Sequence, residues 1–281
     1  MTRFNRPTPV QHGVLNGTQY AVYGAGTPVV LIHGVGLNQD AWGCQIDTLS
    51  AGHCVITYDT LGHGGSALPP DEAALHHYAD QLHQLLNDLR VDQAVFIGHS
   101  MGALIAIEYA TRHPERTLGV AALNAVFQRS PEQRAAVQAR VRQMKEFGGT
   151  SLVDSTLERW FGNPVPEHHR DAAQALKRVL ETANPVGYQR SYQVFAGSDT
   201  AHAHTLGSIA APMLFVTGEF DPNSTPAMSQ AMASLAQNGS VYVMPNEKHM
   251  LTLTSPDLAN RILLEFLTRI TVTGSTHNVP G

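Results

Sequence analysis

Short apolar runs alternate with amphipathic segments through most of the chain. Consecutive apolar positions are typical of strands covered on both faces, whereas apolar positions three and four apart are typical of helices with one buried side. The runs that predict strands are residues 28–32, 55–58, 95–97, 118–123, 212–218 and 241–244. The segments that predict helices are residues 39–49, 75–89, 104–110, 226–236 and 258–270. The pattern therefore predicts an α/β fold, with a mostly parallel, doubly wound sheet and helices on both faces.

Two interruptions change this picture. Asn16-Gly17 stands between two alternating segments, which is a strong signal for a β-hairpin, so antiparallel strands are expected at the N-terminal edge of the sheet. From Gln128 to about Thr205, helical segments follow one another without a convincing strand. We expect residues 128–205 to form an inserted helical cap, residues 1–127 and 206–270 to form the core, and residues 271–281 to form a polar tail.

The segment Gly98-His99-Ser100-Met101-Gly102 lies where a predicted strand gives way to a predicted helix. A serine on so sharp a turn has the neighbouring chain close on both sides, and Gly98 and Gly102 provide the clearance. The helix that follows directs free N–H groups and its positive dipole end toward the hydroxyl, where negative charge develops in acyl transfer. Ser100 is therefore the candidate nucleophile.

A serine hydroxyl needs a base to take its proton, and an imidazole base needs a partner on its other nitrogen. His249 follows the last predicted strand, and Asp221 follows the strand before it. Because ligands in such sheets bind at the carboxyl ends of the strands, Ser100, Asp221 and His249 are expected to converge at one edge.

Other acids compete with Asp221 for this role. Asp59 precedes the serine in the chain, which does not fit the order serine, acid, histidine, and Glu219 is so close to its strand that its side chain is expected to point sideways. The end of the strand after the serine helix is another possible acid position, but Asn124 occupies it. Asp221 is the best candidate.

The remaining histidines predict no metal site. The pairs His76-His77, His168-His169 and His202-x-His204 lack the i, i+4 spacing with a following acid that a zinc-binding helix shows, so they are interpreted as solvated faces. His33 is expected to shape its own turn. The glycine-rich loop 59–66 is interpreted as a tight connection without chemistry.

Taken together, these features resemble the α/β-hydrolase superfamily over nearly the whole chain. The resemblance rests on the order Ser100, Asp221, His249, on the nucleophile elbow and on the turn at residues 33–36. Serine at position 100 separates the chain from the dehalogenase and epoxide-hydrolase branches, which use aspartate as the nucleophile.

The resemblance also implies roles for other residues. The backbone N–H groups of Val35 and Met101 would form the oxyanion hole, and the insertion at 128–205 would be a lid over the pocket. The loop 59–66 resembles the family segment D-x-R-G-x-G-x-S, but Leu61 stands where arginine is common. The role of that arginine therefore does not transfer to this chain.

The expected function is hydrolysis of a small soluble ester or lactone through an acyl-enzyme, in the carboxylic-ester hydrolase class and without a cofactor. The same three residues could instead serve an amide or a C–C bond in a vinylogous diketone, and a third reading is a ligand receptor built on the hydrolase fold.

Substrate contacts are expected from the cap. It holds ten Lys and Arg against eight Asp and Glu, while the rest of the chain holds eight against fifteen. This excess hints at a carboxylate-bearing substrate held by Arg129 or Arg190, although solvated helix faces give the same count. Trp160 and Tyr188 are the leading candidates for the pocket wall, and the other cap aromatics considered are Phe161, Tyr192 and Phe195.

Composition narrows the class of protein further. Hydrophobic residues make up 43% of the 281 residues and charged residues 15%, as in globular proteins, and the formal charge of −5 argues against a nucleic-acid partner. No apolar run reaches the roughly 18 residues that a membrane span needs, and residues 1–7 lack an apolar signal segment. A cytoplasmic enzyme with a small-molecule substrate is expected, with oligomeric state left open.

Overall fold

The computed structural model describes residues 7–274, apart from the side chains of Thr150 and of residues 271–274. Most of the N-terminal stretch examined for a signal segment therefore lies outside the described residues, as do residues 275–281 of the predicted polar tail. Helix α10 (Pro256–Gly274) continues past residue 270, where the helix was expected to end. Within residues 7–274, no helix combines the length and apolar character that crossing a bilayer requires.

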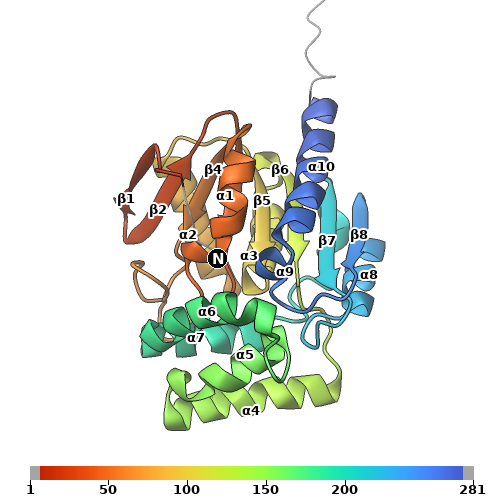
Figure 1. Ribbon diagram of the computed structural model, residues 1–281. Coiled ribbons are helices and arrows are strands. Elements are labelled where there is room, and N and C mark those ends of the chain that lie inside the picture. The colour runs from red at the N-terminus through yellow and green to blue at the C-terminus, as the bar shows by residue number, and fades with distance from the viewer. Residues whose placement is uncertain (1–6, 275–281) are drawn as a thin grey trace, which may run out of the picture.

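The described residues contain one eight-stranded sheet with the order β1-β2-β4-β3-β5-β6-β7-β8 (Figure 1). The strands are β1 (Gln11–Leu15), β2 (Thr18–Tyr23), β3 (Thr27–Ile32), β4 (His53–Tyr58), β5 (Ala94–His99), β6 (Thr117–Leu123), β7 (Met213–Gly218) and β8 (Gly239–Met244). Strands β4 to β8 and β3 run parallel, whereas β1 and β2 pair antiparallel. The predicted fold class is confirmed.

The N-terminal hairpin forms at the predicted dipeptide. Asn16 and Gly17 both have positive φ, of 46° and 76°, which is the conformation that a two-residue hairpin turn needs. Strand β2 then pairs with β4 instead of its sequence neighbour β3. The hairpin therefore extends the parallel sheet with an antiparallel edge.

Helices cover both faces of the sheet (Figure 1). One face carries α1 (Gly43–Ser50), α9 (Leu251–Thr254) and α10, and the other carries α2 (Leu75–Asp88), α3 (Met101–Arg112) and α8 (Pro226–Leu235). The helix predicted over 39–49 begins with the 3₁₀ turn η1 (Gln39–Trp42), because the Asn38 side chain accepts a hydrogen bond from the backbone N–H of Asp40 and caps this short turn.

Between β6 and β7 the chain is helical and lies at the lower end of the view in Figure 1; this segment, residues 128–205, is called the cap below. Its helices are α4 (Pro131–Phe147), α5 (Val153–Phe161), α6 (Arg170–Thr182) and α7 (Pro185–Gly197). Helix α4 begins at a reciprocal capping pair, in which the side chains of Ser130 and Gln133 each accept a hydrogen bond from the other residue's backbone N–H. Helix α7 begins where the Asn184 side chain accepts hydrogen bonds from the next turn.

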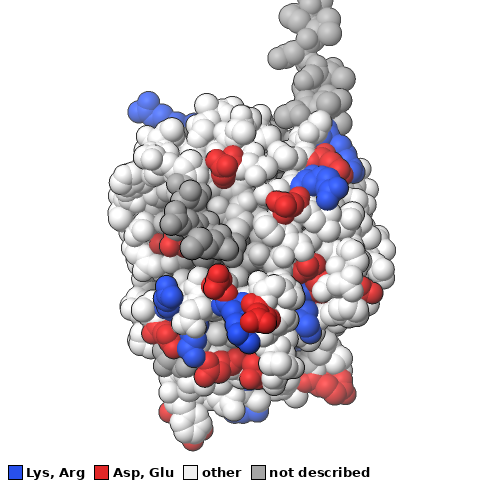
Figure 2. Space-filling model, viewed as in Figure 1, with Lys and Arg blue, Asp and Glu red and all other residues white. Residues whose placement is uncertain are grey.

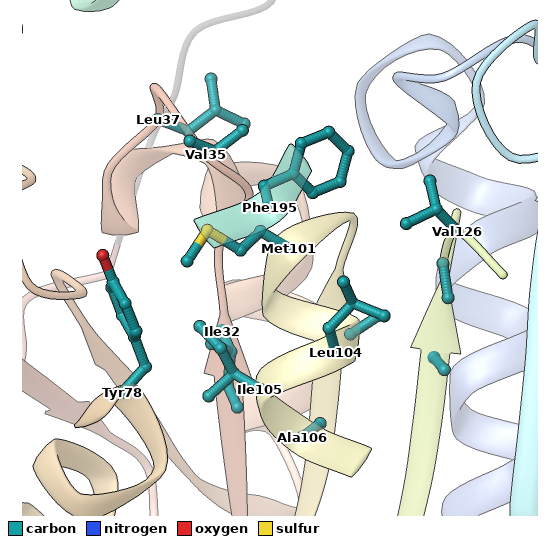
Figure 3. Packing of buried hydrophobic residues seen from close by; sticks show 14 of the residues in the cluster. Ile32, Val35, Leu37, Tyr78, Met101, Leu104, Ile105, Ala106, Val126 and Phe195 are labelled. Carbon is teal, nitrogen blue, oxygen red and sulfur yellow. The ribbon is translucent and has the colours of Figure 1, made fainter. Parts of the chain in front are cut away.

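The apolar core continues from the sheet into the cap without a break. Figure 3 shows Val35, Met101 and Phe195 close together at the N-terminal end of α3, and they belong to one cluster of buried side chains. On the surface, acidic and basic residues are interspersed over the face of the cap that Figure 2 shows. The positive excess of the cap therefore does not gather into a patch on that face.

Candidate active site

Ser100 occupies a strained turn between β5 and α3. Its φ of 56° and ψ of −115° are unusual for a residue with a side chain. The neighbouring glycines make this turn possible, because a Cβ on Gly98 would lie 2.5 Å from the nitrogen of Ala103 and one on Gly102 would lie 2.7 Å from the carbonyl oxygen of His33. The close approach of β3, β5 and α3 thus holds Ser100 at the sheet edge.

Asp221 and His249 form a buried hydrogen-bonded pair. Asp221 follows β7 and His249 follows β8, and Nδ1 of His249 lies 2.7 Å from Oδ2 of Asp221. Asp221 also accepts hydrogen bonds of 2.8 Å from the Asn124 amide and from the backbone N–H of Asn223. Burial alone would raise the pKa of Asp221, but the charge of His249 and these hydrogen bonds together hold that pKa below its usual value. The carboxylate is therefore ionised at neutral pH.

The competing acids have other partners. Asp59 accepts hydrogen bonds from the backbone N–H groups of Gln39 and Gly65, and Glu219 accepts one from the backbone of Asn246. Asn124 stands at the alternative acid position and donates to Asp221. Among the acids weighed from the sequence, only Asp221 is hydrogen-bonded to His249 in the described residues.

A cavity of about 200 Å³ lies between the sheet edge and the cap. Ser100, His249 and Val35 line it from the core side. The cap contributes four aromatic side chains, those of Trp160, Tyr188, Tyr192 and Phe195, together with three arginines. A mainly apolar cavity with a few polar groups is the usual form of a small-molecule site.

A family model described as alpha/beta hydrolase fold matches residues 27–256. The chain belongs to the alpha/beta-hydrolase family. It is 36% identical over 248 residues to an (E)-2-((N-methylformamido)methylene)succinate hydrolase of Acinetobacter baylyi, a match that covers 88% of this chain and 93% of that relative. A 3-oxoadipate enol-lactonase 2 of the same organism is 28% identical, with 86% of this chain and 89% of the relative covered.

Among solved structures, an enol-lactonase from Burkholderia xenovorans LB400 matches this alpha/beta hydrolase with a TM-score of 0.84 and 25% identity. The match covers 92% of this chain and 100% of the enol-lactonase chain. The named relatives support hydrolase function, and the resemblance drawn from the sequence is confirmed.

The structure gives this hydrolase's loop 59–66 more than the connecting role expected of it. The backbone N–H of Gly36 donates to Nε2 of His63 at 2.9 Å, and that of Thr60 donates to Nε2 of His33 at 2.9 Å. Nδ1 of His33 lies 2.8 Å from the carbonyl oxygen of Gly34. The loop therefore braces the turn at residues 33–36 through two histidine rings, which must be neutral to accept these hydrogen bonds.

His99, within the elbow itself, also has a bracing role. Its Nε2 donates to the backbone carbonyl of His249 at 2.9 Å, so the loop that carries the base is tied to the loop that carries the serine. His202 differs from the expectation of a solvated face, because it is buried and its Nε2 donates to the carbonyl of Leu104 at 3.2 Å.

Acid is expected to destabilise the fold through these buried rings. Burial lowers the pKa of His33 and His202 to about 4 and that of His63 and His99 to about 3. As pH falls below about 6.5, these histidines become protonated in the unfolded chain but stay neutral in the folded chain. The free energy of unfolding therefore falls by about 1.4 kcal/mol per pH unit for each ring. The protein therefore keeps its full stability above about pH 6.5 as far as these rings are concerned, and it loses stability as the pH falls toward 4.

Urea unfolding between pH 7.5 and pH 5 measures this slope. His202→Gln keeps a donor for the Leu104 carbonyl and is expected to make the slope shallower. A free energy of unfolding that stays constant over this range would contradict the assignment of neutral buried rings.

Not all of the residues predicted to contact substrate lie at the cavity. Trp160, Tyr188 and Arg129 line it, but Arg190 does not. The guanidinium of Arg190 donates to the carbonyl of Pro69 at 2.7 Å and pairs with Asp71. Arg190 lies away from the cavity because positions two apart on a helix differ in direction by about 200°. Helix α7 therefore cannot present both Tyr188 and Arg190 to the cavity.

The cavity also has two arginines that the sequence reasoning missed, Arg140 and Arg159. A signal for Arg140 was present, because Gln133, Val137 and Arg140 follow one another at helical spacing and share the inner face of α4. Arg159 precedes Trp160 on the short helix α5, where no such series marks it.

Proposed function

We propose that this chain is a serine hydrolase that cleaves a small ester or lactone through an acyl-enzyme. The observation that carries the proposal is the buried His249–Asp221 pair, at 2.7 Å, beside a cavity that Ser100 and His249 both line. A serine on a strained elbow, an oriented imidazole and an ionised carboxylate are the three groups that acyl transfer by this route requires.

In the proposed reaction, His249 takes the proton of Ser100 as the hydroxyl oxygen attacks the substrate carbonyl. Asp221 stays ionised, holds the ring by Nδ1 and stabilises its positive charge. His249 then gives the proton to the leaving group, and the acyl-enzyme forms. In the second half, His249 activates a water molecule that attacks the acyl carbon, and Ser100 leaves with its proton restored.

The oxyanion would be held by the backbone N–H groups of Val35 and Met101. Met101 is the first residue of α3, where backbone N–H groups have no partner within the helix. Val35 lines the cavity between Gly34 and Gly36, whose backbone is held by His33 and His63. This rigid turn supports the role, because preorganised donors stabilise developing charge most effectively.

The size of the site favours a small substrate. A cavity of about 200 Å³ is below the 300–1,000 Å³ typical of drug-sized ligands. The cap, residues 128–205, would act as a lid that excludes water during the reaction. The relationship to 3-oxoadipate enol-lactonase 2 supports a lactone or ester as the bond that is cleaved.

An amide is the second candidate. The relative that is 36% identical is named for a substrate with an N-methylformamido group, and the same three residues serve attack on an amide carbonyl. A C–C bond in a vinylogous diketone stays a third possibility on the same chemistry. The bond that is cleaved therefore has to be measured.

Covalent labelling tests the proposal directly. A fluorophosphonate probe is expected to modify the wild-type protein on the peptide that contains Ser100, and Ser100→Ala is expected to remain unlabelled. The exposed Ser234→Ala variant is the matched control and should label like the wild type. Equal labelling of Ser100→Ala would refute the assignment of the nucleophile.

A substrate panel then identifies the bond. p-Nitrophenyl esters, lactones, N-formyl enamines and vinylogous 1,5-diketones would be assayed with the wild type and with Ser100→Ala. Fastest serine-dependent turnover of esters or lactones would support the first candidate, and fastest turnover of the amide would replace it with the second. Labelling without turnover of any compound would favour a ligand receptor.

A further inference from the structure

Two arginines of the cap line the cavity, and each has a buried N–H group with no partner among the described residues. Nη2 of Arg140 donates to the hydroxyls of Ser155 and Thr156 at 3.2 and 3.0 Å, but its Nε is buried without an acceptor. Nη1 of Arg159 is likewise buried without one. Both side chains line the same cavity as Ser100.

Arg129, the third arginine of the cavity, has a guanidinium group with protein partners. Arg129 lies 3.5 Å from Oδ1 of Asp199, donates to the carbonyls of Phe195 and Ala196, and stacks over the Phe195 ring at 4.6 Å. Asp199 also accepts from Arg134. Arg129 is thus occupied in fixing the cap, which leaves Arg140 and Arg159 as the cations available to a ligand.

The charges of Arg140 and Arg159 have no acidic neighbour in the part of the cavity wall that the structure describes. Within the described residues, no Asp or Glu side chain lines the cavity. Burial, followed by repulsion from Arg140, lowers the pKa of Arg159, although a guanidinium stays charged at neutral pH. A desolvated guanidinium N–H group without an acceptor is costly, and a bound anion would supply acceptors and offset the mutual repulsion.

We propose that Arg140 and Arg159 form a subsite that binds a carboxylate of the substrate while the carbonyl to be attacked lies at Ser100. The inference rests on the proposed function and adds the substrate class, an ester, lactone or amide that carries a free acid group. Guanidinium groups suit this role because their N–H fork matches the two oxygens of a carboxylate.

The position of the subsite limits the spacing within the substrate. Arg159 adjoins Trp160, whose ring lies 6.0 Å from the ring of His249, centroid to centroid. Helix α5 therefore lies close to the base, and the cavity volume of about 200 Å³ leaves room for only a short linker. We expect the acid group and the reacting carbonyl to be separated by a few carbon atoms.

Matched esters test the subsite. Monoethyl succinate and ethyl butyrate differ mainly in replacing a terminal methyl with a carboxylate, and their hydrolysis can be followed by acid release. The wild type is expected to favour monoethyl succinate in kcat/KM, and Arg159→Met is expected to lower this preference about 10- to 100-fold. Arg140→Met should lower it as well, and Arg159→Lys should retain part of it.

The control is Arg142→Met, the same substitution on an exposed position of α4, which should leave the preference unchanged. A wild type that favours ethyl butyrate, or an Arg159→Met variant with the wild-type preference, would overturn the subsite while leaving the hydrolase assignment intact. No turnover of either ester, together with no fluorophosphonate labelling, would overturn the proposed function instead.

Binding without turnover separates the two ideas further. Calorimetric titration of Ser100→Ala with succinate is expected to show binding that Arg159→Met, added to the same variant, weakens at least about 10-fold. Inorganic phosphate bound more tightly than succinate would overturn the assignment to a carboxylate. Unaltered succinate binding in the double variant would overturn the role of Arg159, whichever bond the enzyme cleaves.

Discussion

Replacing Ser100 with alanine is expected to lower kcat by about 10⁴- to 10⁶-fold on the best substrate of the panel. The variant loses the oxygen that forms the acyl-enzyme, while the cavity, the cap and the oxyanion turn remain. Its free energy of unfolding should stay close to that of the wild type, because the change removes one oxygen atom from the site. Steady-state kinetics with purified protein and urea unfolding measure the two effects.

The double variant Ser100→Ala, His249→Ala gives a sharper test of mechanism. Residues that act as one unit lose nearly all of their effect when the first of them is removed, so the double variant should be about as slow as either single one. Losses that multiply would indicate that His249 and Ser100 act independently. A Ser100→Ala enzyme within about tenfold of the wild type would contradict covalent catalysis at this residue.

Gly98→Ala is expected to lower the free energy of unfolding by about 4 kcal/mol or more, or to prevent folding altogether. The new Cβ would overlap the carbonyl oxygen of Gly102 and lie 2.5 Å from the nitrogen of Ala103. Both are backbone atoms of helix α3, which follows β5. The overlap can therefore be removed only if the helix moves away from the sheet. The move would also release the strained conformation of Ser100.

Gly197→Ala is the matched control for this prediction. Gly197 is the exposed last residue of α7, and a Cβ there would meet no atom within 4 Å. Alanine in a helix is favoured over glycine by roughly 0.5–1 kcal/mol, so this variant should be as stable as the wild type or slightly more stable. A Gly98→Ala protein whose free energy of unfolding lies within about 1 kcal/mol of the wild-type value would contradict the close contact between β5 and the first turn of α3.

Much of the fold could be predicted because its signals are local. The hairpin depends on Asn16 and Gly17, the buried strands on consecutive apolar residues, and the elbow on glycines on either side of Ser100. The pairing of His249 with Asp221 followed from one further rule, that parallel strands bring their carboxyl ends to one edge. These features required no knowledge of how the cap packs.

The details of the cap followed from packing that no local pattern specifies. Arg129 lines the cavity, but its guanidinium also pairs with Asp199, which lies four helices further along the chain. Arg190 was expected at the pocket and lies against Pro69 and Asp71. His202 was expected on a solvated face and is buried beside Leu104. In each case the partner comes from a distant segment, which only the folded chain brings near.

The sequence by itself determined the sheet, the elbow and the candidate reaction, because strand burial, turn conformation and chain order are properties of short segments and of their succession. Tertiary structure decided which cations remain available to a ligand. Ten Lys and Arg residues of the cap are equivalent in a charge count, but Arg140 and Arg159 are distinguished because they line the cavity and because each has a buried N–H group without an acceptor among the described residues. Charge count is a property of composition, whereas pairing and desolvation depend on which side chains meet.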